Sequence, residues 1–557
     1  MKPILPLIVA AMTWLGFTIA CLGQDAKPQE PANLATAEHL FQSGKFAEAI
    51  QQYQQALKTN PRLVPAQAGL IRAYLDDDQV DAAFDFARTS LALQPDSALL
   101  LAAMGNVQYR RGEFSDAQTS FLRAQKIDPN LVQTYLGLGR IYRAASLYRR
   151  AYEETRRAHE IAPQDAEVQR AWLALLPRGE RLKALEAYLA APHADDREEN
   201  AKLHSWLEYL RATAGEPVHA CKLANNIEKT EVPMQIFLRD TRRVAGYGLI
   251  VKINNRSQRL LLDTGASGLV ISRGAAEKAG LRRISAVQLG GIGDRGRRDA
   301  FLAVADEVRI GDLNFKDCVI TVSEKSMGLD EDGLIGADVF SSYVVDIDIP
   351  GDRLRLTPLP RRPEDTVVQA TLASEAHFNR DADERSNPVR NSPTAEAIPP
   401  GPLGRLPKDR YIAPEMADWA KVFRFGHDLL IPTRVNDSKT LLFVLDTGAS
   451  TNTMSTKAAR DITKVRSDDA TKVKGLSGAV NNVYSADNAT LQFGNIRQPN
   501  QDMVTFDLSP ISKNLGVEVS GFLGFATFRQ LEMKIDYRDG LVGFVYDPSK
   551  LPPSLRP

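Results

Sequence analysis

The hydrophobic and small positions in the first third of the chain recur with a period of 34 residues. The period is marked by Pro61, Pro95, Pro129 and Pro163. Two columns of small residues keep the same phase: Ala49, Ala83, Ala117 and Ala151, then Ala56, Ser90, Ala124 and Ala158. A third column, of turn residues, is Gly44, Asp78, Gly112 and Ser146. Small residues allow two helices to cross closely, and proline ends a helix because it cannot donate the next hydrogen bond. The pattern therefore predicts paired helices.

A 34-residue helix–turn–helix period with these columns resembles the tetratricopeptide repeat, here over residues 34–163. The resemblance implies an α-helical superhelix whose concave face binds a peptide or a protein partner. The alternative is a spacer or a brace for the neighbouring domain. Residues 164–230 keep helical apolar spacing through Trp172, Leu185 and Trp206, and are expected to form degenerate repeats or a cap.

Near Pro233 the helical period gives way to short β-rich runs that occur in two copies, over residues 236–357 and 419–550. In each copy an apolar run ends in Asp-Thr-Gly-Ala-Ser, first at 263–267 and again at 446–450. Each copy continues with a short helix, at Gly274 to Ala279 and at Thr456 to Asp461, and then with two apolar residues and a glycine. Residues 358–418 between the copies are rich in proline and charge, which predicts a flexible linker, with a processing segment as the alternative.

An apolar strand that ends in Asp-Thr-Gly-Ala-Ser resembles the active-site loop of the retropepsin and pepsin families of aspartic proteases. The expected fold is therefore multidomain α + β, with the tetratricopeptide superhelix followed by two retropepsin-like closed β-barrel lobes. By this resemblance Asp263 and Asp446 are the catalytic residues. Their loops are supported by Thr264, Gly265 and Ser267 and by Thr447, Gly448 and Ser450. The threonines would hydrogen-bond across the pseudo-twofold axis, and the serines would orient the outer carboxylate oxygens.

The residue types fit hydrolysis of a peptide bond without a metal or cofactor. Two carboxylates that share one proton supply both a base for water and an acid for the scissile carbonyl. A glycine-rich hairpin should cover the substrate, and the candidates are Gly290, Gly291, Gly293, Gly475 and Gly478. Four further acidic residues are expected to be structural. Asp332 and Asp338 should lie in turns at the surface, and Asp348 and Asp536 should make hairpin bonds.

Each lobe contributes one aspartate, so two lobes must pair. Pairing within the chain is favoured, because covalent linkage raises the effective concentration of the partner lobe. The alternative is that each lobe pairs with its twin in a second molecule. The sequence thus favours an aspartic endopeptidase with a peptide or protein substrate. The alternative from another class is a non-catalytic envelope scaffold or peptide-binding protein with degenerate protease-like lobes.

The N-terminus adds an expectation about location. Residues 1–23 have a short basic start and an apolar run, as in an export signal, which predicts a periplasmic or secreted protein. Cys21 lies in a loose lipobox, so a lipid anchor there would be the only membrane link. Lys+Arg and Asp+Glu are both 69, which gives no support for a nucleic-acid partner. Cys221 and Cys318 could form a disulfide, but two buried thiols are favoured.

Overall fold

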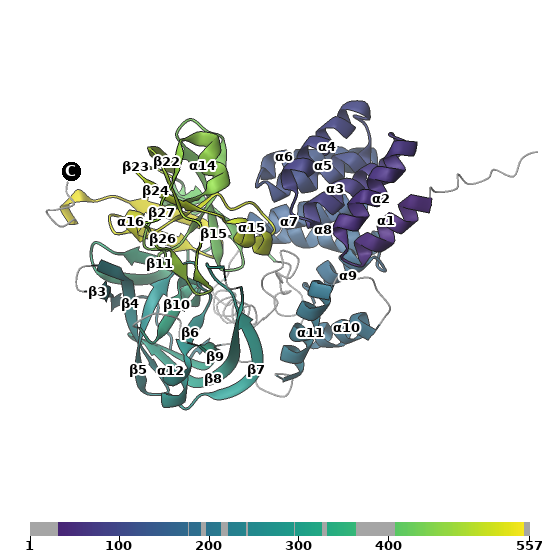
Figure 1. The fold of residues 1–557 in the computed structure, drawn as a ribbon. Coiled ribbons are helices and arrows are strands. Elements are labelled where there is room, and N and C mark those ends of the chain that lie inside the picture. Colours follow the sequence, from purple (N-terminus) through teal and green to yellow (C-terminus); the bar gives the residue numbers. More distant parts are fainter. Residues whose placement is uncertain are drawn as a thin grey trace, which may run out of the picture.

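The computed structural model describes residues 32–176, 178–190, 197–212, 221–240, 243–294, 296–325, 331–363 and 407–550. A run of consecutive helices comes first and β-rich sheets follow, as the sequence predicted (Figure 1). The segment 1–23, Cys21 included, lies outside the described residues, as does most of the linker. Within the described ranges, no helix has the length and apolar character needed to cross a membrane.

The predicted repeats are pairs of antiparallel helices. Their bounds are α1 (Ala32–Gln42), α2 (Phe46–Thr59), α3 (Val64–Asp76), α4 (Val80–Leu93), α5 (Ala98–Arg110), α6 (Phe114–Ile127), α7 (Val132–Ala144) and α8 (Tyr148–Ile161). The alanine column from Ala49 to Ala151 is fully buried, because these residues lie where paired helices touch. Every residue of the turn column has a positive φ, from 57° at Ser146 to 73° at Gly112, which ends one helix and starts the next.

The helical region ends earlier than the sequence predicted. It continues through α9 (Ala166–Leu173), α10 (Arg178–Ala190) and α11 (Arg197–Ala212), but β1 (Lys222–Leu223) already pairs with β9 (Leu313–Ser323). The expectation of buried thiols is also wrong, because Cys221 and Cys318 form a disulfide. This bond fixes the chain to the first lobe immediately before β1, and β2 (Thr230–Pro233) follows, so residues 221–230 belong to that lobe.

The first lobe is built on a sheet that has nine strands within the described residues. Besides β1 and β9 its elements are β3 (Gln235–Asp240), β4 (Arg243–Ile253), β5 (Arg256–Asp263), β6 (Leu269–Ser272), α12 (Arg273–Lys278), β7 (Arg282–Leu289), β8 (Arg298–Ile310), β10 (Gly333–Gly336) and η1 (Ala337–Phe340). The short helix predicted after the Asp263 loop is α12, and Ser272 caps it by accepting from the amide of Ala275.

The second lobe repeats this plan on a sheet in which ten strands are described. Its elements are β14 (Phe423–Phe425), β15 (Asp428–Val435), β16 (Thr440–Leu445), β17 (Thr453–Ser455), α14 (Thr456–Ile462), β18 (Val465–Ser467), β21 (Tyr484–Ala486), β22 (Ala489–Phe493), β23 (Ile496–Asn500), β24 (Met503–Phe506), α15 (Ser509–Leu515), β25 (Gly521–Leu523) and α16 (Phe525–Phe528). A separate hairpin consists of β19 (Lys474–Gly475) and β20 (Gly478–Ala479). The predicted second short helix is α14.

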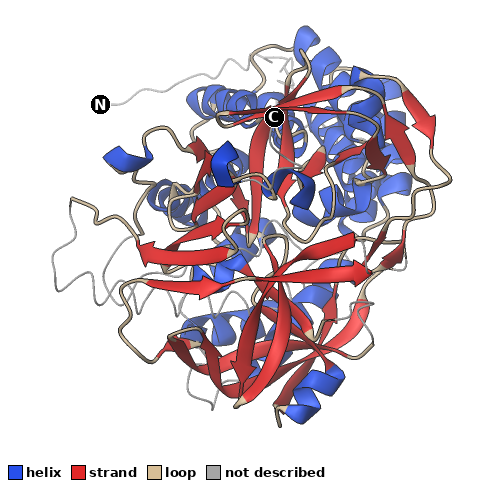
Figure 2. Cartoon of the chain, turned by 90° about the vertical axis from the view of Figure 1, so that its left-hand side faces the viewer, coloured by secondary structure: helices blue, strands red, loops and turns tan. Residues whose placement is uncertain are grey.

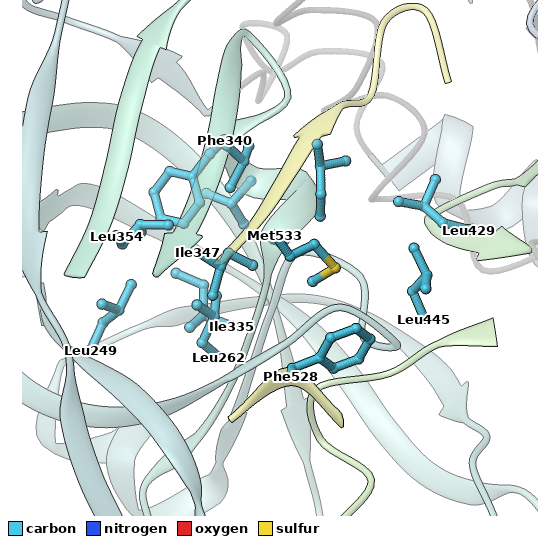
Figure 3. Packing of buried hydrophobic residues seen from close by; sticks show 14 of the residues in the cluster. Leu249, Leu262, Ile335, Phe340, Ile347, Leu354, Leu429, Leu445, Phe528 and Met533 are labelled. Carbon is cyan, nitrogen blue, oxygen red and sulfur yellow. The ribbon is translucent and has the colours of Figure 1, made fainter. Parts of the chain in front are cut away.

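A third sheet joins the two lobes (Figure 2). Its strands are β2, β11 (Tyr343–Asp348), β12 (Arg353–Pro358), β13 (Ala420–Lys421), β26 (Glu532–Asp536) and β27 (Leu541–Val545), and η3 (Pro548–Lys550) follows. The joint is the antiparallel pair β11–β26, in which Val345 lies opposite Ile535. One core continues across this sheet, from Leu262 and Ile335 to Met533 and Leu445 (Figure 3). The lobes are therefore fused by both backbone pairing and apolar packing.

The two described ends of the linker meet at one buried carboxylate. Asp539 is fully buried and accepts from the guanidinium of Arg362 at 2.6 Å and from the amide of Tyr411 at 2.9 Å. Just before Tyr411, Asp409 accepts from the amides of Arg149 and Arg150 and so caps α8. Both ends of the predicted linker, including η2 (Pro414–Met416), are thus part of the packed structure.

The helical repeats pack directly on the second lobe (Figure 1). The ring of Phe114 lies 4.4 Å from that of Phe423, centre to centre, in an apolar cluster shared by both domains. Ion pairs surround this cluster, including Lys439–Glu113 at 2.8 Å and Lys513–Asp78 at 2.9 Å. The contact uses the turns of the repeats, so the turn column serves the neighbouring lobe as well as the superhelix.

The last helices of the helical region pack on the first lobe. Trp206, Leu207 and Leu210 of α11 lie in one apolar cluster with Leu302 of β8, and Ile284 and Val287 of β7 pack against it. The helical region therefore contacts both lobes, and its second contact is with the strands that lead to the glycine-rich tip at 290–293.

The disulfide should contribute measurably to stability. Replacing Cys221 by Ser removes a cross-link between residues 97 positions apart. We expect the free energy of unfolding to fall by about 2–5 kcal/mol, because the unfolded chain regains the entropy of a long loop. Urea unfolding measures this change, and a reductant should weaken the wild type but leave the C221S variant unaffected. Free thiols at both positions in the native protein would contradict the bond.

Candidate active site

Two buried strands carry the Asp-Thr-Gly-Ala-Ser loops to the junction of the lobes. β5 runs parallel to β10, with Ile335 opposite Leu262 and Gly336 opposite Asp263. β16 runs parallel to β25 in the same way, with Leu523 opposite Leu445. The apolar pair and glycine noted in each copy thus lie directly behind the loop. These strands read as continuous apolar runs because they are covered on both faces.

The two loops hold each other through their threonines. Thr264 is fully buried, and its hydroxyl donates to the carbonyl of Leu445 at 2.8 Å while accepting from the amide of Thr447 at 3.0 Å. The hydroxyl of Thr447 donates to the carbonyl of Leu262 at 2.9 Å and accepts from the amide of Thr264 at 3.0 Å. The network predicted across the pseudo-twofold axis is therefore present, and it joins two segments of one chain.

This network brings Asp263 and Asp446 face to face. A Cβ atom placed on Gly448 would lie 2.5 Å from Cγ of Asp263, and one on Gly265 would lie 2.9 Å from Cγ of Asp446. Only glycine leaves room for the carboxyl of the opposite lobe at this distance. The glycine amides also bind the carboxylates, because Gly265 donates to Asp263 at 2.8 Å and Gly448 to Asp446 at 2.9 Å.

The two carboxyl groups differ in their surroundings. Burial, repulsion from Asp446 and a hydrogen bond to Asp446 raise the pKa of Asp263 well above its ordinary value, against one opposing amide from Gly265. Burial also raises the pKa of Asp446, but the amides of Ala449 and Gly448 and the hydrogen bond from Asp263 oppose it. Asp446 thus receives two backbone hydrogen bonds where Asp263 receives one, and the proton is better placed on Asp263.

The serines of the loops lie in different environments. Ser267 donates to Asp338 at 3.1 Å, and Asp338 also accepts from the amide of Gly268 at 2.8 Å. Ser450 is exposed. Asp338 is only 5% exposed, so the expectation that it lies at the surface is wrong: it holds the end of the Asp263 loop. Asp332 is partly buried and accepts from the amide of Arg259.

The other two acidic residues behave as expected from the sequence. Asp348 accepts from the amide of Gly351 at 3.0 Å, and Asp536 accepts from the amide of Asp539 at 3.0 Å. Both close the turn of a hairpin in the sheet that joins the lobes.

The glycine-rich candidates from the two lobes meet tip to tip. Gly290, Gly291 and Gly293 lie in the turn between β7 and β8, and Gly475 and Gly478 lie in the β19–β20 hairpin. The amide of Ser477 donates to the carbonyl of Ile292 at 2.9 Å, and a Cβ on Gly291 would lie 2.7 Å from that of Leu476. Leu476 packs in an apolar cluster with Ala266 of the Asp263 loop. We call these two tips the flaps.

Sequence reasoning missed a polar group from the second lobe that reaches the Asp263 loop. Nε2 of His427 lies 3.1 Å from the carbonyl oxygen of Gly265. The neighbouring Asp428 raises the pKa of both Asp263 and Asp446 by charge repulsion. Both residues stand well before the Asp446 loop in sequence, outside the motif, and only the pairing of β14 with β15 gives them this place.

The threonine network can be tested by removing one hydroxyl. Thr264→Val keeps the shape of the side chain but leaves the buried carbonyl of Leu445 and amide of Thr447 without this partner. We expect the free energy of unfolding to fall by about 2–4 kcal/mol, measured in urea, because unpaired buried polar groups are costly. Thr264→Ser keeps the hydroxyl and serves as the control. Equal stability of the valine variant and the wild type would contradict the network.

The facing carboxyls should destabilise the fold at neutral pH. A group whose pKa is raised by folding contributes stability below its unfolded pKa, and this contribution is lost as the pH rises through the folded pKa. Asp263 has such a raised pKa. Asp263→Asn should therefore shift the urea midpoint upward at pH 7, with a smaller gain at pH 4. Asp502→Asn, an exposed aspartate in the same chain, is the control. A lower midpoint for D263N at pH 7 would oppose this account.

Known protein families match both the helical part and the β-rich part of the chain. Residues 249–339 and 431–527 match the family model of the aspartyl proteases, and residues 40–107 match a tetratricopeptide repeat model. Among solved structures, a thermophilic tetratricopeptide protein of Thermus thermophilus has 19% identity and a TM-score of 0.28, covering 33% of this chain and 99% of its own. The aspartic proteinase of Irpex lacteus has 12% identity and a TM-score of 0.32, covering 57% of this chain and 97% of its own. No curated protein matches. The family models thus match two segments of the chain to the aspartyl proteases, behind a segment that matches a tetratricopeptide repeat.

Proposed function

We propose that this protein is an aspartic endopeptidase in which Asp263 and Asp446 form one catalytic dyad within the chain. The observation that carries the proposal is the crossed threonine network, which holds the two carboxyl groups against each other. Carboxyl groups at such short range share one proton and so provide an acid and a base together.

The two aspartates take different roles in this proposal. Asp446, which accepts from the amides of Gly448 and Ala449, is the ionised base that binds the attacking water. Asp263, with a single such amide, carries the shared proton. The pair titrates as a unit, so the active form holds one proton and activity follows a bell-shaped pH profile.

The reaction then proceeds in two proton-balanced steps. The water oxygen attacks the scissile carbonyl carbon, Asp446 takes a proton from the water, and Asp263 gives its proton to the carbonyl oxygen. The resulting gem-diol collapses when Asp446 passes its proton to the amide nitrogen and a diol hydroxyl returns a proton to Asp263. The carbon–nitrogen bond breaks, a carboxylic acid and an amine leave, and the dyad returns to its first state.

The flaps support an extended peptide as the substrate. Each lobe contributes one flap, and the flaps contact each other through Ser477 and Ile292. A peptide bound between the flaps and the Asp-Thr-Gly loops would be shielded from water, which strengthens the electrostatic interactions of the reaction. The flaps must open for entry, because Leu476 at the tip of one flap packs against the same apolar cluster as Ala266 of the Asp263 loop.

We also propose a protein partner for the concave face of the repeats. Three residues of the turn column, Asp78, Gly112 and Ser146, contact residues that follow the linker, so this edge acts as a brace. Recruitment of a substrate or scaffold would then use the concave face, and no cofactor takes part in the proposed chemistry.

The protein is further proposed to act outside the cytoplasm, in the periplasm or after secretion. The support is the disulfide between Cys221 and Cys318, since structural disulfides persist mainly in oxidising compartments. The apolar start of the sequence agrees with export. Lipidation at Cys21 remains a separate prediction.

The dyad is tested with two single variants. Asp263→Asn and Asp446→Asn should each lower cleavage of casein or a mixed peptide library by about 10³-fold or more, because residues that act as a unit fail together. The assay covers acidic to neutral pH, and Asp502→Asn should cleave as the wild type does.

The same variants test the pairing of the lobes. A dyad within one chain predicts that a mixture of D263N and D446N stays inactive. Residual activity near half in each single variant would show that each lobe pairs with its twin in another molecule. Intact substrates over the whole pH range with the wild type would favour a binding or scaffold function.

A further inference from the structure

The register of the sheets shows where the two lobes differ beside the dyad. In the first lobe Gly248 lies opposite Leu261, and in the second lobe Leu430 lies opposite Val444. Leu261 and Val444 each precede their loop aspartate by two residues, so Gly248 and Leu430 occupy equivalent positions. The same alignment of the two strands makes His427 and Asp428 equivalent to Ala245 and Gly246 of the first lobe. At these two positions the first lobe thus has no counterpart of the His–Asp pair.

His427 is fixed in a tight turn. β14 and β15 pair up to Phe425 and Asp428, so Gly426 and His427 form the turn, with φ of 65° at Gly426. The guanidinium of Arg424 donates to the carbonyl of Gly426 at 2.8 Å, and the buried Phe425 anchors the strand. The imidazole is therefore presented to the other lobe by a rigid backbone.

One nitrogen of the imidazole lies near two oxygen acceptors. Nε2 of His427 lies 3.1 Å from the carbonyl oxygen of Gly265 and 3.6 Å from Oδ1 of Asp428. A carbonyl only accepts, so Nε2 carries a hydrogen in the neutral and in the charged ring alike. The contact crosses from the second lobe to the first, at the residue whose amide binds Asp263.

Several charged and titratable groups surround this contact. The negative charge of Asp428 raises the pKa of Asp263, of Asp446 and of the buried Tyr537. Arg424 donates to the carbonyl of Tyr537 and to the hydroxyl of Tyr148. The charge of Asp338, behind the Asp263 loop, also raises the pKa of Tyr537. The His–Asp pair therefore belongs to a polar layer that lies against the loop of one lobe.

We propose that His427 is a positioning residue for Asp263, which fixes the Gly265 segment of the catalytic loop from the opposite lobe. We also propose that Asp428, whose carboxylate lies 3.6 Å from the same imidazole nitrogen, places a negative charge beside this contact. This inference rests on the proposed function. His427 holds the loop that presents the protonated carboxyl, while the negative charge of Asp428 favours retention of the shared proton. At the equivalent positions of the first lobe, Ala245 and Gly246 carry no polar side chain that could support the loop of the second lobe in this way.

The test compares His427→Ala, His427→Gln and Asp428→Asn, with Asp502→Asn as the matched control for loss of a carboxylate. H427A should speed hydrogen exchange in a peptide spanning residues 259–268 but not in one spanning 441–452. H427Q keeps a side-chain N–H donor and should restore protection. D428N should move the carbon-13 titration of both dyad carboxyls to lower pH, because a like charge is lost. The two signals are assigned from D263N and D446N.

Turnover provides a second readout. H427A should lower kcat about 10- to 100-fold with little change in KM, and H427Q should recover most of the loss. Unchanged exchange in H427A, equal loosening of both loops, or no recovery in H427Q would overturn the positioning role. An unchanged titration in D428N would overturn the charge role. Hydrogen exchange and the carbon-13 titration do not depend on turnover. An inactive wild type would therefore reject the peptidase proposal, while these two measurements would still test the roles of His427 and Asp428.

Discussion

The crossed hydrogen bonds between Thr264 and Thr447 are the constraint on which the site depends. Each hydroxyl donates to a backbone carbonyl of the other lobe and accepts a hydrogen bond from a backbone amide of that lobe. The buried polar groups in this network therefore find their partners only when the two loops meet. Buried backbone groups need such partners. The fusion of the lobes through β11 and β26, and the core that continues across them, keep the two loops within reach of this network.

The glycines of the loops follow from the same constraint. Once the loops are crossed, Gly265 lies under Asp446 and Gly448 lies under Asp263, with no room for a side chain. The residue pattern of the motif can thus be understood as a packing requirement as much as a chemical one. Burial of two facing carboxyls costs stability at neutral pH, and the surrounding sheets have to offset that cost.

Much of this arrangement could be predicted from the sequence, because it follows local patterns. The 34-residue period indicated the helix pairs, and the two Asp-Thr-Gly-Ala-Ser segments located the loops, their threonines and the short helices behind them. The prediction of two buried thiols is wrong, since the cysteines lie 97 positions apart and only the pairing of β1 with β9 brings them together. Asp338 and His427 were missed or misplaced for the same reason: their contacts depend on long-range packing that leaves no local period.

Covalent linkage of two similar lobes also removes the symmetry that a pair of identical molecules would impose. Both lobes keep a flap and an Asp-Thr-Gly loop, but the second carries His427 and Asp428, and within the described residues it is the first whose flap strands pack against α11. The helical region contacts the second lobe near β14 and the first lobe at β7 and β8, so it reinforces this difference from outside. The strand β14 that packs on Phe114 leads directly into the turn that holds His427. The helical repeats and the Asp263 loop of the opposite lobe are therefore connected through the short β14–β15 hairpin.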